Sequence, residues 1–157
     1  MSAQGKDADE PRVRDIMRRD AVTVGPQATV QALADLLRAH DIRSVPVVDK
    51  GRLVGVVTEG DIVAQDADLH FPHYIQFLDS LIYLESIKKF EERLRKVVGA
   101  SVREIMTAEA ITTAPDDTVA HAATLMSDNR INLLPVVEES KLVGIVTRHE
   151  IVASMGL

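Results

Sequence analysis

The sequence predicts an α/β (α+β) fold made of two copies of one βαββα unit, packed face to face with pseudo-twofold symmetry. The main observation is an internal repeat, since residues 13–64 align without a gap with residues 102–153. A chain of 157 residues is one ordinary domain's worth, so each copy is half a domain and the two must share a core. Short apolar runs also alternate with amphipathic segments, which is typical of a covered sheet.

Each copy shows the same elements in the same order. Those of the first copy are a short strand at 22–24, a helix beginning after Thr29, two hairpin strands at 45–48 and 53–57, and a last helix from Thr58. Thr29 favours a helix start because its hydroxyl can accept a hydrogen bond from a free backbone N–H, and Thr118 repeats it. Asp49-Lys50-Gly51 predicts the hairpin turn, since Gly tolerates the geometry that a tight turn needs.

The repeats divide the chain into a flexible tail at 1–11, a first repeat at 12–64, an insert at 65–101 and a second repeat at 102–157. The insert contains all three Phe and both Tyr of the chain, so its apolar surface must be buried against its own module, over a cleft or in a second subunit. Apolar residues at helical spacing predict a helix in it: Tyr83, Ile87, Phe90, Leu94 and Val97.

Composition argues against several classes of function. A net charge of −6 disfavours nucleic acid and anionic membranes as partners, because both need a basic face. Without Cys there is no disulfide, thiolate nucleophile or sulfur metal site. No apolar run reaches the length of a membrane span, and the start does not resemble a signal peptide, so we expect a soluble cytoplasmic protein.

Four potential metal ligands precede the predicted insert helix: Asp66, Asp68, His70 and His73. Their spacing suits no single rigid element, and Pro72 breaks regularity between the two histidines. A polar loop explains them more simply, and we expect no metal site.

The segment 55–61, Gly-Val-Val-Thr-Glu-Gly-Asp, runs from a strand into a helix start. A helix start presents free N–H groups and the positive end of the helix dipole, which favours an anion such as phosphate. Thr58 can add a hydroxyl donor, and Asp61, one turn later, can accept both hydroxyls of a ribose. The same spacing is close to a capping box, in which the two side chains satisfy each other's backbone N–H groups. Capping is the commoner reason for such a pattern.

The order of motifs resembles that of two CBS motifs forming a Bateman module, in the family named after cystathionine β-synthase. The matching motifs are Val-x-Asp-Ile-Met at 13–17, Pro-Val-Val at 46–48 and Gly-h-h-Thr-x-x-Asp at 55–61, where h is apolar. Similar motifs recur in the second copy, so the resemblance covers both repeats. It implies a cleft between the motifs that binds an adenosine-containing ligand, and a sensing function without catalysis.

The resemblance also implies roles for individual residues. Asp61 matches the acid that binds ribose, and Thr58 the hydroxyl that contacts phosphate. Thr23 matches the position that borders the base, and Val45 the place where backbone groups contact the adenine edge. Strand packing explains the side chains of Val45 and Pro46 equally well. A weaker second site would contain Thr112, Leu134, Thr147 and Glu150.

The two copies differ where the resemblance places the ligand. Glu150 replaces Asp61, and Glu is the better partner in a capping box, which favours a structural role. Arg148 and His149 occupy a helix start, where cations are disfavoured unless an anion offsets them. We therefore expect one working cleft, whose ligand phosphates contact Arg148 and His149, with Arg43 as a further candidate. The alternative for all three side chains is simple solvation.

We expect a regulatory module that needs no cofactor, has no catalytic residues and transmits ligand occupancy to an unknown effector protein. The ligand is AMP, ADP or ATP, with S-adenosylmethionine, NAD or cyclic di-AMP as further candidates. Family modules commonly dimerise, which predicts a homodimer. A second hypothesis is a scaffold protein that uses the insert helix and has vestigial clefts. A third is a small hydrolase or transferase using Asp61 or His149, although the sequence has no P-loop or dinucleotide fingerprint.

Overall fold

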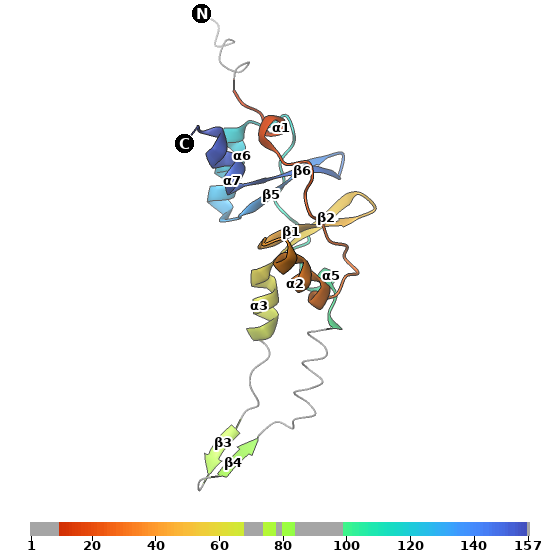
Figure 1. The fold of residues 1–157 in the computed structure, drawn as a ribbon, viewed down its shortest axis with the longest axis vertical. Coiled ribbons are helices and arrows are strands. Elements are labelled where there is room, and N and C mark those ends of the chain that lie inside the picture. The colour runs from red at the N-terminus through yellow and green to blue at the C-terminus, as the bar shows by residue number, and fades with distance from the viewer. Residues whose placement is uncertain (1–9, 68–73, 78–79, 84–98, 157) are drawn as a thin grey trace, which may run out of the picture.

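The computed structural model describes residues 10–67, 74–77, 80–83 and 99–156, which form two similar series of elements (Figure 1). The first series is α1 (Val13–Ile16), α2 (Val30–Ala39), β1 (Ser44–Asp49), β2 (Arg52–Thr58) and α3 (Glu59–Ala67). The second is α5 (Val102–Ile105), α6 (Val119–Asn129), β5 (Leu133–Glu138), β6 (Lys141–Thr147) and α7 (Arg148–Ser154). Between them lie the short strands β3 (Tyr74–Phe77) and β4 (Ser80–Tyr83).

The two predicted hairpins form one sheet with the strand order β1-β2-β6-β5. In the first hairpin Asp49 pairs with Arg52, and Lys50 and Gly51 make the turn with φ values of 52° and 81°. The hairpins pair near their tips, where Arg52 is opposite Lys141. Strands β1 and β5 also contact each other, and their first residues line shared clefts.

The strand expected at 22–24 is reduced to a single bridge in the structure. Val24 pairs in parallel with Val47, and its backbone exchanges hydrogen bonds with Pro46 O (3.2 Å) and Val48 N (2.9 Å). The ladder ends there because Gly25 and Pro26 turn the chain, and proline has no N–H to continue it.

The predicted helix caps are confirmed in both repeats. Thr29 Oγ1 accepts a hydrogen bond from Ala32 N (3.1 Å), and Thr118 Oγ1 accepts one from His121 N (3.1 Å). Helix α2 then buries the apolar face that its spacing predicts, through Val30, Leu33 and Leu37.

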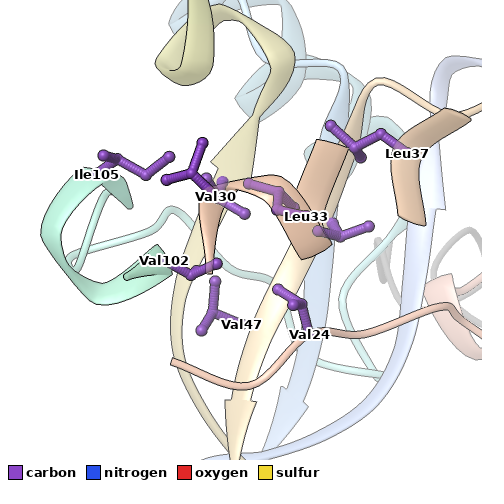
Figure 2. Packing of buried hydrophobic residues seen from close by; sticks show 9 residues of the cluster. Val24, Val30, Leu33, Leu37, Val47, Val102 and Ile105 are labelled. Carbon is purple, nitrogen blue, oxygen red and sulfur yellow. The ribbon is translucent and has the colours of Figure 1, made fainter. Parts of the chain in front are cut away.

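The first helix of each repeat, α1 or α5, packs in the core of the other repeat, so the opening segments of the repeats are exchanged. Val13 of α1 is fully buried in the core of the second repeat, and Val102 and Ile105 of α5 are buried in the core of the first. Figure 2 shows Val102 and Ile105 among the side chains of α2 and β1. The backbone follows the same exchange, since Val13 N donates to Asp117 O and Val102 N to Ala28 O, each at 2.8 Å. Each core is therefore completed by the other repeat.

The exchange continues beyond the short helices and explains a glycine in each inner strand. Thr107 pairs with Val56 of β2, as Arg18 pairs with Ile145 of β6. A Cβ on Gly55 would lie 2.7 Å from Thr107 O, and Gly144 stands in the same relation to the backbone of Arg18. Only glycine allows the crossing segments to approach this closely.

The insert differs from expectation where it is described. Strands β3 and β4 pair as an antiparallel hairpin in which Tyr74 is opposite Tyr83, so Tyr83 ends a strand and does not begin a helix. Aromatic and β-branched residues in these segments favour strands. The other residues of the predicted helical stripe and the tail at 1–9 lie outside the described residues. None of the helices that the structure describes is both long and apolar enough to cross a bilayer.

Candidate functional site

A cleft of about 620 Å³ lies between the two repeats, beside the start of α3. Its lining comes equally from the first repeat (Arg43, Ser44, Val56, Thr58, Glu59, Gly60, Asp61, Val63) and the second (Thr107, Glu109, Ala110, Ile111, Arg130, Ile131, Asn132, Leu133). We call it the large cleft. Neither repeat alone can form it, and the crossing segment that carries Thr107 is part of its wall.

Thr58 and Asp61 form the predicted capping arrangement at the start of α3. Asp61 Oδ2 accepts hydrogen bonds from Thr58 N (2.8 Å) and Thr58 Oγ1 (3.1 Å), and Asp61 N donates to Thr58 Oγ1 (3.2 Å). Both residues also line the cleft, so capping and ligand contact are compatible here. Asp61 Oδ1 accepts no hydrogen bond from any residue that the structure describes, so it remains available to a hydroxyl donor.

Two arginines line the large cleft, one from each repeat. Arg43 precedes β1, and its Nε lies 3.9 Å from Glu59 Oε1 in a mostly exposed pair, which contributes little stability. Arg130 ends α6 in the left-handed region with φ 53° and forms no ion pair with the described residues. That conformation costs a residue with a Cβ roughly 1–2 kcal/mol, and Asp tolerates it better than Arg. Asp41 is the counterpart of Arg130, with φ 50°.

A smaller cleft of about 190 Å³ is related to the large one by the repeat. Its lining residues are Arg18, Ala21, Val22, Ile42, Arg43, Ser44, Asn132, Leu133, Ile145 and Thr147. Arg18 of the small cleft is equivalent to Thr107 of the large cleft, and Thr147 of the small cleft is equivalent to Thr58 of the large cleft. The counterparts of Glu59, Gly60 and Asp61 are absent from this lining.

Glu150 caps α7 and is buried, with 7% of its surface exposed. Its Oε2 accepts hydrogen bonds from Thr147 N (2.8 Å) and from the Thr147 hydroxyl. Its Oε1 lies 4.0 Å from Arg18 Nε. Both carboxylate oxygens are therefore engaged within the protein, unlike those of Asp61.

The side chains of the remaining residues proposed from the sequence do not line the large cleft. Thr23 is exposed and lines a separate hollow of about 180 Å³, and Val45 is fully buried in the first core. Arg148 and His149 are exposed at the start of α7 and line neither cleft. In the weaker second site, Thr112 is exposed and Leu134 is fully buried, and only Thr147 lines the small cleft.

Sequence reasoning missed Arg130 and Thr107. Arg130 could have been found from the change of charge between the copies, since its counterpart is Asp41. Thr107 required knowledge of the exchange, for which the sequence signal is Gly55, because a glycine inside an apolar strand often marks the close approach of another backbone.

Metal ligation has no candidate in the described part of the chain, where no group of three or more suitable side chains comes together. The residues weighed in the sequence for that role, Asp68, His70 and His73, lie outside the described residues, as does the side chain of Asp66.

Residues 13–68 and 102–156 each match the CBS domain. The chain belongs to the CBS-domain family. The matched segments are the two repeats, so the protein contains a CBS pair, and the crossed openings and the two clefts described above are features of that pair.

Similar CBS proteins are known as sequences and as solved structures. An uncharacterized protein of Methanocaldococcus jannaschii, MJ1426, is 34% identical over 91% of this chain and 90% of its own length. The structure of CBSX2 of Arabidopsis thaliana in complex with AMP has a TM-score of 0.71 at 27% identity, over 92% of this chain and 96% of that one. The CBS pair of protein MJ0100 in complex with 5′-methylthioadenosine and S-adenosyl-L-methionine has a TM-score of 0.66 at 28% identity, over 94% and 97%.

Proposed function

We propose that this CBS pair is a regulatory module that binds one adenosine-containing nucleotide in the large cleft. The observation that carries the proposal is the set of groups gathered there. A carboxylate oxygen of Asp61 is available, a helix start and two arginines lie beside it, and apolar side chains line the rest. Its volume of about 620 Å³ lies within the range of small-molecule and cofactor sites.

Asp61 is the proposed ribose ligand. The capping bonds from Thr58 hold its carboxylate at the edge of the cleft, through Oδ2, while Oδ1 stays free to accept a hydroxyl. A charge-assisted hydrogen bond of this kind is stronger than one between neutral groups. The cap thus positions the side chain for the ligand.

The base is proposed to lie against the apolar part of the wall, formed by Val56, Ile111, Ile131 and Leu133. Aliphatic side chains from both repeats can cover the two faces of a planar ring and exclude water from it. Ser44 and Asn132, from the corresponding segments of the two repeats, add polar groups that can hydrogen-bond a base edge.

The phosphates are proposed to lie between the start of α3 and the two arginines. The backbone N–H of Gly60 lies in the first turn of α3, and a helix start favours an anion, whereas the N–H of Glu59 donates to Arg43 O at 2.8 Å. Arg43 and Arg130 approach from different repeats, so an anion bound by both would hold the repeats at a fixed separation. This assigns to Arg43 and Arg130 the phosphate contacts that the sequence suggested for Arg148 and His149.

The ligands of similar proteins support the same chemistry, since the solved structures of CBSX2 and of the MJ0100 pair contain AMP, or 5′-methylthioadenosine and S-adenosyl-L-methionine. AMP, ADP and ATP are the first candidates here because the two arginines favour a phosphate-bearing ligand. Ligand occupancy would be passed to an effector protein through the separation of the repeats.

The proposal includes a homodimer formed through α3 and α7. Val63 and Val152 are related by the repeat and are 63% and 50% exposed, and Met155 is 62% exposed. Exposed apolar side chains at equivalent positions of two helices are typical of an interface. Light scattering should give the mass of a dimer, and V63D combined with V152D should give a monomer. A monomeric unaltered chain would remove this part of the proposal.

Thermal unfolding with a ligand panel tests the binding function. The panel contains AMP, ADP, ATP, S-adenosylmethionine, NAD and cyclic di-AMP, with inorganic phosphate as a control. A ligand at a hundred times its Kd should stabilise the fold by about 2.7 kcal/mol. If no member of the panel raises the Tm at millimolar concentration, the proposal is wrong.

A further inference from the structure

The small cleft has equivalent backbone contacts to the large one, but one of its lining residues, Arg18, lies 4.0 Å from the buried Glu150. Residues Arg18 and Thr107 occupy equivalent positions on the two crossing segments, and their backbones make matching hydrogen bonds. Arg18 exchanges two bonds of 2.9 Å with Ile145, and Thr107 exchanges bonds of 2.9 and 3.0 Å with Val56. The difference between the clefts therefore comes from side chains and not from the course of the chain.

We propose that Arg18 closes the small cleft by pairing with Glu150, and so limits the CBS pair to one nucleotide. The inference rests on the proposed function and concerns a residue that sets how many ligands are bound. The positively charged Arg18 side chain would occupy the space beside Glu150. The equivalent space beside Asp61 is where the ligand is proposed to bind in the large cleft.

The Arg18 side chain, which is 53% exposed, lies near two carboxylates. Its Nε lies 4.0 Å from Glu150 Oε1 and 3.9 Å from Asp20 Oδ1. Thr107, in the large cleft, is too short to reach Asp61 in this way and leaves the space open. The small cleft has about 190 Å³ and the large one about 620 Å³, which is the direction that the longer Arg18 side chain predicts.

Glu150 is also unsuited to a ligand for a reason of its own. It is buried, and a buried carboxylate needs a partner for its charge, which Arg18 provides. Its Oε2 is used by Thr147, and a ligand that contacted its Oε1 would compete with Arg18. Asp61 has a free oxygen beside an open space instead.

The test exchanges the residues of the two clefts and counts bound AMP by isothermal titration calorimetry. The unaltered chain should bind one AMP per chain. R18T combined with E150D gives the small cleft the threonine and the aspartate of the large one and should add a second binding event. T107R places the arginine beside Asp61 and should reduce the affinity of the large cleft at least tenfold.

R19T is the matched control, because Arg19 is the adjacent arginine and does not line the small cleft. It removes the same charge and should leave one AMP per chain with unchanged affinity. Circular dichroism and the Tm establish that each variant is folded. R18T alone is the fallback if the double variant unfolds, and it should gain a second, weaker binding event.

Three results would overturn the inference alone: two AMP bound by the unaltered chain, one AMP bound by folded R18T/E150D, or undiminished affinity in folded T107R. If the unaltered chain bound a second AMP that R18T lost, Arg18 would be a phosphate ligand and not a block. No binding to any variant would instead contradict the proposed function, and with it this inference.

Discussion

The two clefts of this CBS pair have the same backbone and different contents. In both, a strand glycine admits a crossing segment and a Thr-x-x-acid motif caps the following helix. In the large cleft the acid keeps one oxygen free, whereas the buried Glu150 has one oxygen hydrogen-bonded to Thr147 and the other 4.0 Å from the half-exposed Arg18. The comparison shows that duplication preserves the framework, while a few side chains at the edge decide which copy of a site stays open.

The first test asks whether the cores of the two repeats differ in packing at equivalent positions, as the two clefts differ in their side chains. Leu33 is fully buried in the first core, and Ala122 occupies the equivalent position of the second. L33A should lower the free energy of unfolding by about 2–5 kcal/mol, because a large cavity would be left. A122L should cost about 1–3 kcal/mol through overpacking. Urea unfolding measures both, and a loss below 1 kcal/mol in L33A would contradict the packing described.

The crossing segments give a second test. G55A and G144A should each destabilise the fold by roughly 1–3 kcal/mol, since the new Cβ meets a backbone oxygen at 2.7 or 2.9 Å. Only G55A displaces Thr107, so only G55A should also weaken AMP binding in calorimetry. Equal binding by the two variants would show that the wall carrying Thr107 is not part of the ligand site.

Substitution of single arginines tests which residues contact the phosphates of the ligand. R130A should weaken ADP binding about three- to tenfold, the effect of one exposed charge-assisted hydrogen bond, and should leave adenosine binding nearly unchanged. R148A is the control, because Arg148 is exposed and lines neither cleft. An effect of R148A larger than that of R130A would return the phosphate contacts to the start of α7.

The smallest expected effect concerns a turn that both repeats contain and that only the second repeat closes with a carboxylate side chain. The backbone N–H of Ala114 and the hydroxyl of Thr113 donate to Asp117 and hold the pKa of its carboxyl below the usual value. Asp117 therefore stabilises the fold above its unfolded pKa of about 3.9, and this is lost as pH falls through the folded pKa. D117N should cost about 1 kcal/mol at pH 7 and much less near pH 2.

Urea unfolding of D117N and the unaltered chain at the two pH values provides the check. Ala28 occupies the equivalent position of the first repeat, so A28G serves as a control whose effect should not depend on pH. A D117N effect that was the same at both pH values would mean that the charge of Asp117 does not act through these hydrogen bonds.

Local patterns predicted the elements that depend on near neighbours. The hairpins, the Thr29 and Thr118 caps and the buried face of α2 all follow from residues within a few positions of one another. The first strand was overestimated, because a run of three β-prone residues does not reveal that the following turn leaves only Val24 paired.

The site was predicted only in part, because half of it comes from distant residues. The motif correctly marked a helix start with a Thr–acid cap in both copies, and the proposal that the Asp-to-Glu change separates a ligand site from a structural acid stays a prediction. The exchange of α1 and α5 could not be read from two four-residue helices, since their partners lie in the other repeat. Thr107 and the contact between Arg18 and Glu150 depend on that exchange.

The most direct test of the central claim is AMP binding by two variants at equivalent positions of the repeats. In calorimetry, D61A should lose at least about tenfold in affinity, since a charge-assisted hydrogen bond contributes roughly 1.5–3 kcal/mol. E150A, once shown to be folded, should bind AMP within about threefold of the unaltered chain. Equal losses in the two variants, or a larger loss in E150A, would contradict the claim that the large cleft is the working site.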